Sequence, residues 1–262
     1  MPRALASSMS LVLLWAGTAA AQNLPLFPPP GDARGFLPGY TGYVSLEKLG
    51  SDDSRFQWDF DIGADVDVLR AGRARVNLFV NYEAVLGEQL QRFDPIFNNY
   101  AIDVTGGAET GAVELAVRFH HLSRHLGDRQ KRFGIAWNAV GPQVAWRLDG
   151  EALDVQVRGW VLAVYNRYYV DHTTEAGADV IAEHVFSPHW AVVWRGSVLV
   201  MGVQESPRRG TQAGGRLEGA LQVRGGRAQV EVYAAVDRRI DADPIEALPV
   251  TWALAGLRLT TR

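Results

Sequence analysis

The chain alternates between apolar and polar residues over long stretches. From Phe56 to position 68, every even position is apolar, and four of the odd positions are aspartates: Asp59, Asp61, Asp65 and Asp67. Successive side chains of a β-strand point to opposite faces, whereas a helix would spread these residues around its circumference. The pattern therefore predicts a strand with one apolar face and one acidic face.

The same alternation recurs along most of the chain, for example over 76–86, 113–120, 154–163, 216–224 and 229–237. The apolar runs and the turn residues between them predict twelve strands. Segment 178–186 has mixed parity, so a count of ten is the runner-up. The predicted strands are 39–48, 55–70, 74–87, 98–105, 109–124, 132–148, 152–169, 178–186, 190–204, 213–224, 227–239 and 250–261.

The connections between these strands are predicted to alternate between short and long. Glycine-containing pairs and triplets are typical of tight hairpins. The short connections are Ala71-Gly72-Arg73, Gly106-Gly107-Ala108, Asp149-Gly150-Glu151, Ser187-Pro188-His189 and Gly225-Gly226, and the longer ones are 49–54, 88–97, 125–131, 170–177, 205–212 and 240–249. In outer-membrane barrels the short turns lie in the periplasm, which predicts that both chain termini lie there too.

Strand length and charge distribution distinguish a membrane barrel from a soluble sandwich. A tilted strand needs roughly 9 to 11 residues to cross a bilayer, and many of the predicted strands are at least that long. Their polar faces carry many charges while the other faces are nearly free of charge, which favours apolar residues outside and polar residues inside. The prediction is an all-β, transmembrane, antiparallel up-and-down β-barrel.

The first residues have the features of an export signal. Arg3 precedes the apolar run Met9–Trp15, and three alanines precede Gln22, as in a secretory signal peptide. We therefore expect a signal peptide at 1–21, a Pro/Gly-rich periplasmic leader at 22–38 and the barrel at 39–262.

Composition excludes several classes of function. The chain of 262 residues contains no cysteine, so neither a disulfide nor a thiolate site is available. Its 26 basic and 29 acidic residues give a formal charge of −3, which speaks against a nucleic-acid partner. Because no cofactor or metal motif is present, we expect neither cofactor nor metal ion, and we expect a monomer.

Charged residues on the inward parity predict an ion-pair network in the lumen. Four clustered aspartates could also bind Ca²⁺, but the EF-hand spacing is absent, and pairing with arginines across a barrel explains them better. The predicted network comprises Asp59, Asp61, Asp65, Asp67, Glu114, Arg118, Arg147, Arg158, Arg195, Arg216, Glu218 and Arg224.

Pro142 lies inside a predicted strand, where it cannot complete a regular ladder. The apolar positions also change parity there, from Ile135 and Trp137 to Val144 and Trp146. A β-bulge at 141–142 would explain both observations.

The segment Phe119–Asp128 (FHHLSRHLGD) carries two resemblances. Its Ser-x-His-Leu-Gly-Asp run resembles a motif of an uncharacterised family of outer-membrane barrels, in which an acidic residue usually follows where Arg129 stands here. His121-Leu122-Ser123 resembles the His-x-Ser element of outer-membrane lipid A deacylases, which continue with Asn and a small residue and orient the histidine with a downstream carboxylate. Positions 133–139 contain no acid, so Asp128 or another strand would have to supply it.

His121 and Ser123 lie two apart on one strand and share its apolar, outward parity. A neutral histidine beside a serine is the usual arrangement for attack on an ester, which makes His121, Ser123 and Asp128 the candidate catalytic residues. Alternatively, the basic residues nearby would bind lipopolysaccharide phosphates without any chemistry: Arg118, Arg124, Arg129, Lys131 and Arg132. Zinc binding by the local histidines is disfavoured because His120 and His121 face opposite ways.

The sequence therefore predicts an outer-membrane barrel that is structural or forms a narrow pore with a charged lumen. The alternative is a membrane-embedded lipid acyl hydrolase. Either would have outer-membrane lipids or lipopolysaccharide as partners.

Overall fold

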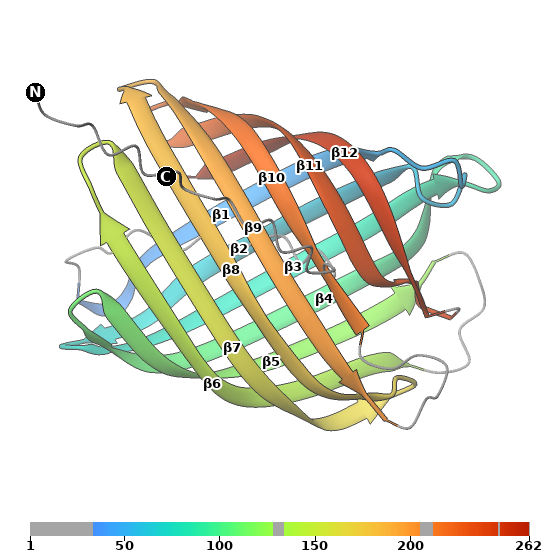
Figure 1. Cartoon of the computed structure of the whole chain (residues 1–262), viewed down its shortest axis with the longest axis horizontal. Coiled ribbons are helices and arrows are strands. Elements are labelled where there is room, and N and C mark those ends of the chain that lie inside the picture. Colours follow the sequence, from blue (N-terminus) through green and yellow to red (C-terminus); the bar gives the residue numbers. More distant parts are fainter. Residues whose placement is uncertain (1–33, 128–133, 205–211, 246, 262) are drawn as a thin grey trace, which may run out of the picture.

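The chain forms a closed barrel of twelve antiparallel strands in the computed structural model (Figure 1), which describes residues 34–127, 134–204, 212–245 and 247–261. Each strand pairs with the next along the chain, and the last pairs with the first. The strands are β1 (Gly35–Leu49), β2 (Trp58–Ala71), β3 (Ala74–Glu88), β4 (Arg92–Thr110), β5 (Val113–Leu126), β6 (Ile135–Asp149), β7 (Leu153–Tyr168), β8 (His172–Ser187), β9 (Trp190–Val203), β10 (Gln212–Arg224), β11 (Ala228–Asp243) and β12 (Leu248–Thr261).

The predicted twelve-stranded barrel is confirmed, and the count of ten is wrong. The strand predicted at 178–186 is β8, which runs from His172 to Ser187 and pairs along most of its length with both neighbours. Its parity is mixed in the sequence because the apolar Ile181, which packs against a buried apolar cluster, shares the inward face with the buried carboxylates of Glu175 and Asp179. Strand β1 begins four residues before the predicted start.

The outward face is apolar and the inward face is polar, as the alternation predicts. Ile62 and Val232 are half-exposed on the outside, at 50% and 57%, whereas the neighbouring Asp59 and Asp61 are 1% exposed inside. No helix within the described ranges is long and apolar enough to cross a membrane.

The seam that closes the barrel is its shortest ladder. Strand β1 pairs with β12 over seven residues, from Tyr43 opposite Thr260 to Leu49 opposite Leu254. Strand β1 begins and β12 ends at the end of the barrel that carries the short turns, which we call the turn end. The opposite end, which carries the other connections, is the loop end. Two of these connections, 89–91 between β3 and β4 and 169–171 between β7 and β8, are short, so the long connections predicted at 88–97 and 170–177 are wrong.

The turn between β4 and β5 is not at Gly106-Gly107-Ala108, and that prediction is wrong. These residues continue β4, and Gly107 pairs with Ala116 of β5. The chain reverses at Gly111 and Ala112, where Gly111 adopts a positive φ of 61°, a conformation that glycine adopts without a steric penalty. Strand β4 therefore has 19 residues.

The bulge predicted at 141–142 is also absent from the β5–β6 ladder, which passes without a shift through the pairs Arg118–Gly141 and Val117–Pro142. The register shifts instead between Asn138 and Ala139, where β6 pairs with β7. The apolar pattern changes because Trp137 points into the barrel, where it belongs to a buried apolar cluster that includes Trp160 and Met201. The lumen is therefore partly apolar toward the loop end.

The loop between β1 and β2, residues 50–57, folds into the loop end of the barrel. Phe56, predicted to face outward on a strand, precedes β2 and is buried inside, with its ring centroid 5.5 Å from that of Trp252. Arg55 binds Asp53 at 2.8 Å and Asp243 of β11 at 2.7 Å. Its hydrogen bonds hold the pKa of the Asp53 carboxyl below its usual range, so this attachment stays charged at neutral pH.

Close aromatic contacts across the strands require glycine at defined positions. A Cβ at Gly256 would lie 2.7 Å from the ring of Tyr233 and 2.8 Å from the carbonyl oxygen of Leu46. We expect Gly256→Ala to lower the free energy of unfolding by about 1–3 kcal/mol, because the added methyl group overpacks this contact. Gly106→Ala is the matched control, since a Cβ there meets no atom within 4 Å. Urea unfolding of the detergent-solubilised barrel measures both, and equal midpoints for the two variants would contradict the expectation.

Candidate functional site

Three arginines and three glutamates form one network inside the barrel, on strands β1 and β9–β12. Arg216 binds Glu47 at 2.7 Å and Glu218 at 2.6 Å. Arg195 and Arg258 each bridge Glu218 and Glu231, at 2.7–2.8 Å. All six side chains are buried. Because the charges balance within the cluster, the cost of desolvating each one is offset by its neighbours.

A second network surrounds Arg239 of β11. Its guanidinium binds Asp59 at 2.6 Å, Glu83 at 2.7 Å and Asp237 at 3.1 Å. Asn99 donates to Glu83, and this links the network to β4.

A third group of charged residues lies on strands β4, β5, β7 and β8. Asp103 binds Arg118 at 2.7 Å and Nδ1 of His120 at 2.5 Å, and Arg158 binds Asp179. The Arg118 guanidinium also lies over the Trp160 ring, 4.7 Å from its centroid.

The residues predicted for the lumen network lie on the inward face, and two of the predicted arginines, Arg195 and Arg216, bind the predicted Glu218. The four aspartates contact Arg239, Asn81, Asn77 and Arg75, in sequence order. Glu114 pairs with Arg75, Arg147 with Asp154 and Arg224 with Glu183. Sequence reasoning missed Glu47, Glu83, Asp103, Asp179, Arg239 and Arg258, although inward parity on the predicted strands was a usable signal for most of them.

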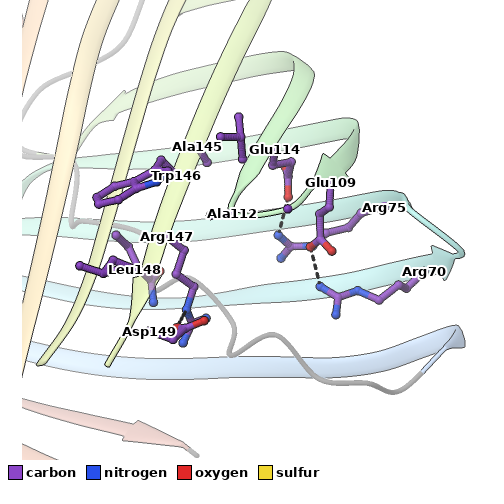
Figure 2. A pocket seen from close by; sticks show the side chains of 13 residues that line it. Arg70, Arg75, Glu109, Ala112, Glu114, Ala145, Trp146, Arg147, Leu148 and Asp149 are labelled. Atoms are coloured by element: carbon purple, nitrogen blue, oxygen red, sulfur yellow. Dashed lines mark hydrogen bonds and ion pairs between the residues drawn. The ribbon is translucent and has the colours of Figure 1, made fainter. Parts of the chain in front are cut away.

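The lumen is hollow at the turn end. A cavity of about 450 Å³ is lined there by Arg75, which binds Glu114 at 3.1 Å, and by Arg70, which binds Glu109 at 3.1 Å (Figure 2). A second cavity of about 310 Å³ shares Arg147 and Gln156 with the first. Between these cavities and the loop end, the buried networks and apolar clusters occupy the lumen.

A polar patch interrupts the apolar outer surface of the barrel toward its loop end. The patch lies on strands β3–β6. Nearer the turn end, the outward positions of β4 and β5 are apolar, for example Val104, Leu115 and Val117. We call it the outer polar patch, and it consists of Tyr82, Asn98, Tyr100, His121, Ser123, His125 and Asn138.

His121 is held by a hydrogen bond to the neighbouring strand. It stands directly opposite Asn138 in the β5–β6 register, and its Nδ1 lies 2.8 Å from Oδ1 of Asn138. A carbonyl oxygen only accepts, so Nδ1 carries the hydrogen. With Nδ1–H donating to Asn138, Nε2 is the ring nitrogen that can act as the proton acceptor of a general base.

Ser123 contacts the other histidine of the row. Its Oγ lies 3.2 Å from Nε2 of His125, a distance at which the hydroxyl can donate to the imidazole. Among the hydrogen bonds between described residues, Ser123 is paired with His125 and not with His121. The rings of His125 and Tyr100 form a T-shaped contact with 5.2 Å between centroids, and Tyr100 packs on Tyr82 at 5.1 Å.

The sequence predicts a carboxylate as the orienting group for His121, and the candidate Asp128 lies outside the described residues. The side chain that bonds His121 is instead Asn138, within the stretch 133–139 that contains no acid. His125 stands in the sequence as a departure from the deacylase pattern, and the structure places it against the serine. Both could have been found by asking which polar residues share the outward parity of β5 and β6.

The alternative of a basic lipid-binding surface is weakened by the direction of its arginines. Arg118 and Arg124 point into the barrel, where Arg118 binds Asp103 and Arg124 binds Asn99 at 2.7 Å. Arg129, Lys131 and Arg132 lie outside the described residues. In the part of the chain that the structure describes, no cluster of three or more His, Asp or Glu side chains is arranged to hold a metal ion.

Comparisons with known proteins identify the fold. The barrel is similar to the NanC porin (8% identity, TM-score 0.51, covering 84% of this chain and 99% of that one). It is also similar to outer membrane phospholipase A from Escherichia coli (10%, 0.53, 85% and 96%) and to an outer membrane channel from Pseudomonas putida (11%, 0.53, 88% and 98%). No family model and no curated protein sequence matches the chain. The fold is that of outer-membrane β-barrels, which include both channels and an enzyme.

The network around Glu218 gives a test of the lumen charges. Glu218→Gln leaves Arg195, Arg216 and Arg258 with two carboxylates between them, so we expect the free energy of unfolding to fall by about 3–5 kcal/mol. The matched control is Glu109→Gln, whose carboxylate is 37% exposed and binds Arg70 near the turn end; it should cost less than about 1 kcal/mol. Urea midpoints in detergent measure both changes, and a Glu218 variant as stable as the control would refute the stabilising role of the network.

Proposed function

We propose that this protein is an outer-membrane lipid acyl hydrolase with Ser123 as its nucleophile. The observation that carries the proposal is the contact of Ser123 Oγ with His125 Nε2 at 3.2 Å, on the membrane-facing side of the barrel. A serine hydroxyl that donates to a neutral imidazole can lose its proton to that imidazole as it attacks an ester. His121, fixed by Asn138 at 2.8 Å, places a second imidazole on the other side of the serine.

The position of Ser123 on the barrel favours a lipid substrate. The serine and both histidines share the outward face of β5, and the apolar row toward the turn end continues with Val117 and Leu115, exposed by 58% and 60%. An acyl chain in the bilayer would lie along this row and bring its ester to Ser123. Polar side chains on the lipid-facing surface of a barrel destabilise it when hydrocarbon surrounds them. A polar patch at this position is therefore explained by a function or by a location near the lipid headgroups.

The orientation of the barrel would select the leaflet. With the short turns in the periplasm, as in other barrels of this type, Ser123 lies toward the outer leaflet, and acyl esters of lipopolysaccharide or phospholipid are within reach. In this proposal residues 1–21 direct export, both termini are periplasmic, and the protein acts as a monomer. Asp128 would then be a further candidate to support the histidines.

The second candidate is a barrel without catalytic activity, structural or with a narrow charged lumen. The observation that favours the structural form of this candidate is the filling of the lumen by buried ion pairs such as Arg216–Glu47 and Arg239–Asp59. These networks stabilise the barrel whether or not it is an enzyme. Planar-bilayer conductance separates the two roles, because ion-selective current together with no lipid turnover would support the pore.

Replacement of the nucleophile tests the enzymatic proposal. We expect purified barrel in detergent micelles to release fatty acid from lipopolysaccharide or phospholipid, and Ser123→Ala to lower that rate by at least ~10³-fold, because the residual activity of a serine hydrolase without its nucleophile is small. Free fatty acid is measured by mass spectrometry.

Ser54→Ala, on an exposed loop residue, is the matched control and should leave the rate unchanged. A wild-type barrel that releases no fatty acid from either lipid, or a Ser123→Ala barrel as active as wild type, would overturn the proposal.

A further inference from the structure

We infer that the two histidines beside Ser123 divide the proton transfers of hydrolysis between them. His125 would accept the proton of the Ser123 hydroxyl when the acyl-enzyme forms. His121 would accept a proton from the water molecule that hydrolyses the acyl-enzyme. This inference rests on the hydrolase function proposed above and assigns separate roles within the same site.

The assignment of His125 to the first half-reaction follows from contact. Its Nε2 is the hydrogen-bond partner of Ser123 Oγ, at 3.2 Å. The His125 ring is supported by the edge-on contact with Tyr100, with an interplanar angle of 83°, and Tyr100 in turn packs on Tyr82. Tyr82 is fixed by its hydroxyl, which donates to Asn98 at 2.9 Å. The aromatic pair thereby limits the rotamers of the imidazole that touches the nucleophile.

The assignment of His121 to the second half-reaction follows from its orientation and spacing. The Asn138 carbonyl fixes the Nδ1–H tautomer, so Nε2 is ready to accept a proton. Same-face neighbours on a strand are separated by about 7 Å at Cα. That separation, without a direct bond to Ser123, leaves room for a water molecule between the imidazole and an acyl group on the serine oxygen. A base that works through one water is within the range that general-base catalysis uses.

The steps balance without any further reactant than water. In the first, the Ser123 hydroxyl proton moves to His125 Nε2, the Oγ–acyl bond forms, the ester C–O bond breaks, and the lipid alkoxide leaves with the proton from His125. In the second, water adds to the acyl-serine carbonyl and gives a proton to His121 Nε2. The bond from the acyl carbon to Oγ then breaks, the fatty acid departs, and Oγ regains a proton that His121 passes through a water molecule between them.

Two rival arrangements give different results. If one histidine did all the proton transfers, its loss would slow both half-reactions together, and loss of the other would slow neither. If His121 were only structural, its replacement would lower stability without changing which half-reaction limits turnover. Pre-steady-state kinetics of the folded barrel separates these cases.

The experiment uses the full-length barrel in detergent micelles with p-nitrophenyl dodecanoate, mixed rapidly. For His121→Asn we expect a burst of one p-nitrophenolate per barrel, followed by turnover slowed ~10²-fold or more, because general-base catalysis is typically worth that factor. Mass spectrometry should find the dodecanoyl group on Ser123. For His125→Asn we expect the acylation step itself to slow by a similar factor, with no acyl-enzyme detected.

Asn138 gives a second measurement that does not remove an imidazole. Asn138→Asp still accepts from Nδ1–H and should keep turnover near that of wild type, whereas Asn138→Leu should accumulate acyl-enzyme as His121→Asn does. His189→Asn, an exposed histidine in the turn between β8 and β9, is the matched control and should change neither phase. The urea midpoint of each variant verifies that the barrel is folded.

The inference fails if His121→Asn lowers the burst and the steady-state rate in equal proportion, or changes neither. It also fails if His125→Asn accumulates acyl-enzyme. These outcomes differ from failure of the hydrolase itself, in which the wild-type barrel releases no product or Ser123→Ala remains active.

Discussion

Charge pairing inside the barrel is the interaction on which the other features depend. Closing twelve strands with apolar residues toward lipid forces the polar side chains of every strand into a narrow lumen. Ionised groups there are stable only when opposite charges lie beside them, and Arg216, Arg239 and Arg118 each lie within hydrogen-bond distance of a carboxylate. With the charges satisfied inside, the outer surface is free to be apolar, and the outer polar patch stands out as an exception.

The alternation with a period of two predicted the fold because each strand of a membrane barrel has one face toward lipid and the other toward the lumen. It failed where the lumen itself is apolar. Phe56 and Trp137 follow the hydrophobic pattern yet lie inside, because the loop end of the barrel is filled by apolar side chains. The pair Gly106-Gly107 has the composition of a hairpin, but the ladder continues through it. Local turn signals were therefore outweighed by strand pairing.

The candidate site was predictable in part. Counting along a single strand places His121 and Ser123 on the same face, whatever the register with the neighbouring strands. It does not give Asn138, which meets His121 only through the pairing of β5 with β6, 17 residues away. Nor does it give the choice of partner for Ser123, which depends on side-chain rotamers. Within a strand, spacing determines which residues share a face, whereas contacts between strands need the structure.

The short seam between β1 and β12 bears on the order in which the barrel can assemble. The ladder there is brief, yet the network inside crosses it: Glu47 of β1 binds Arg216, 169 residues further along, and Tyr233 donates to the same carboxylate at 2.8 Å. Arg258 of β12 joins this cluster through Glu218 and Glu231. Contacts between such distant parts of a chain form late, because the loop they close must be ordered first. Hairpins between strands that are neighbours in sequence can form before barrel closure. The ion pairs of Glu47 and Arg258 then stabilise the closed barrel once β1 and β12 have paired.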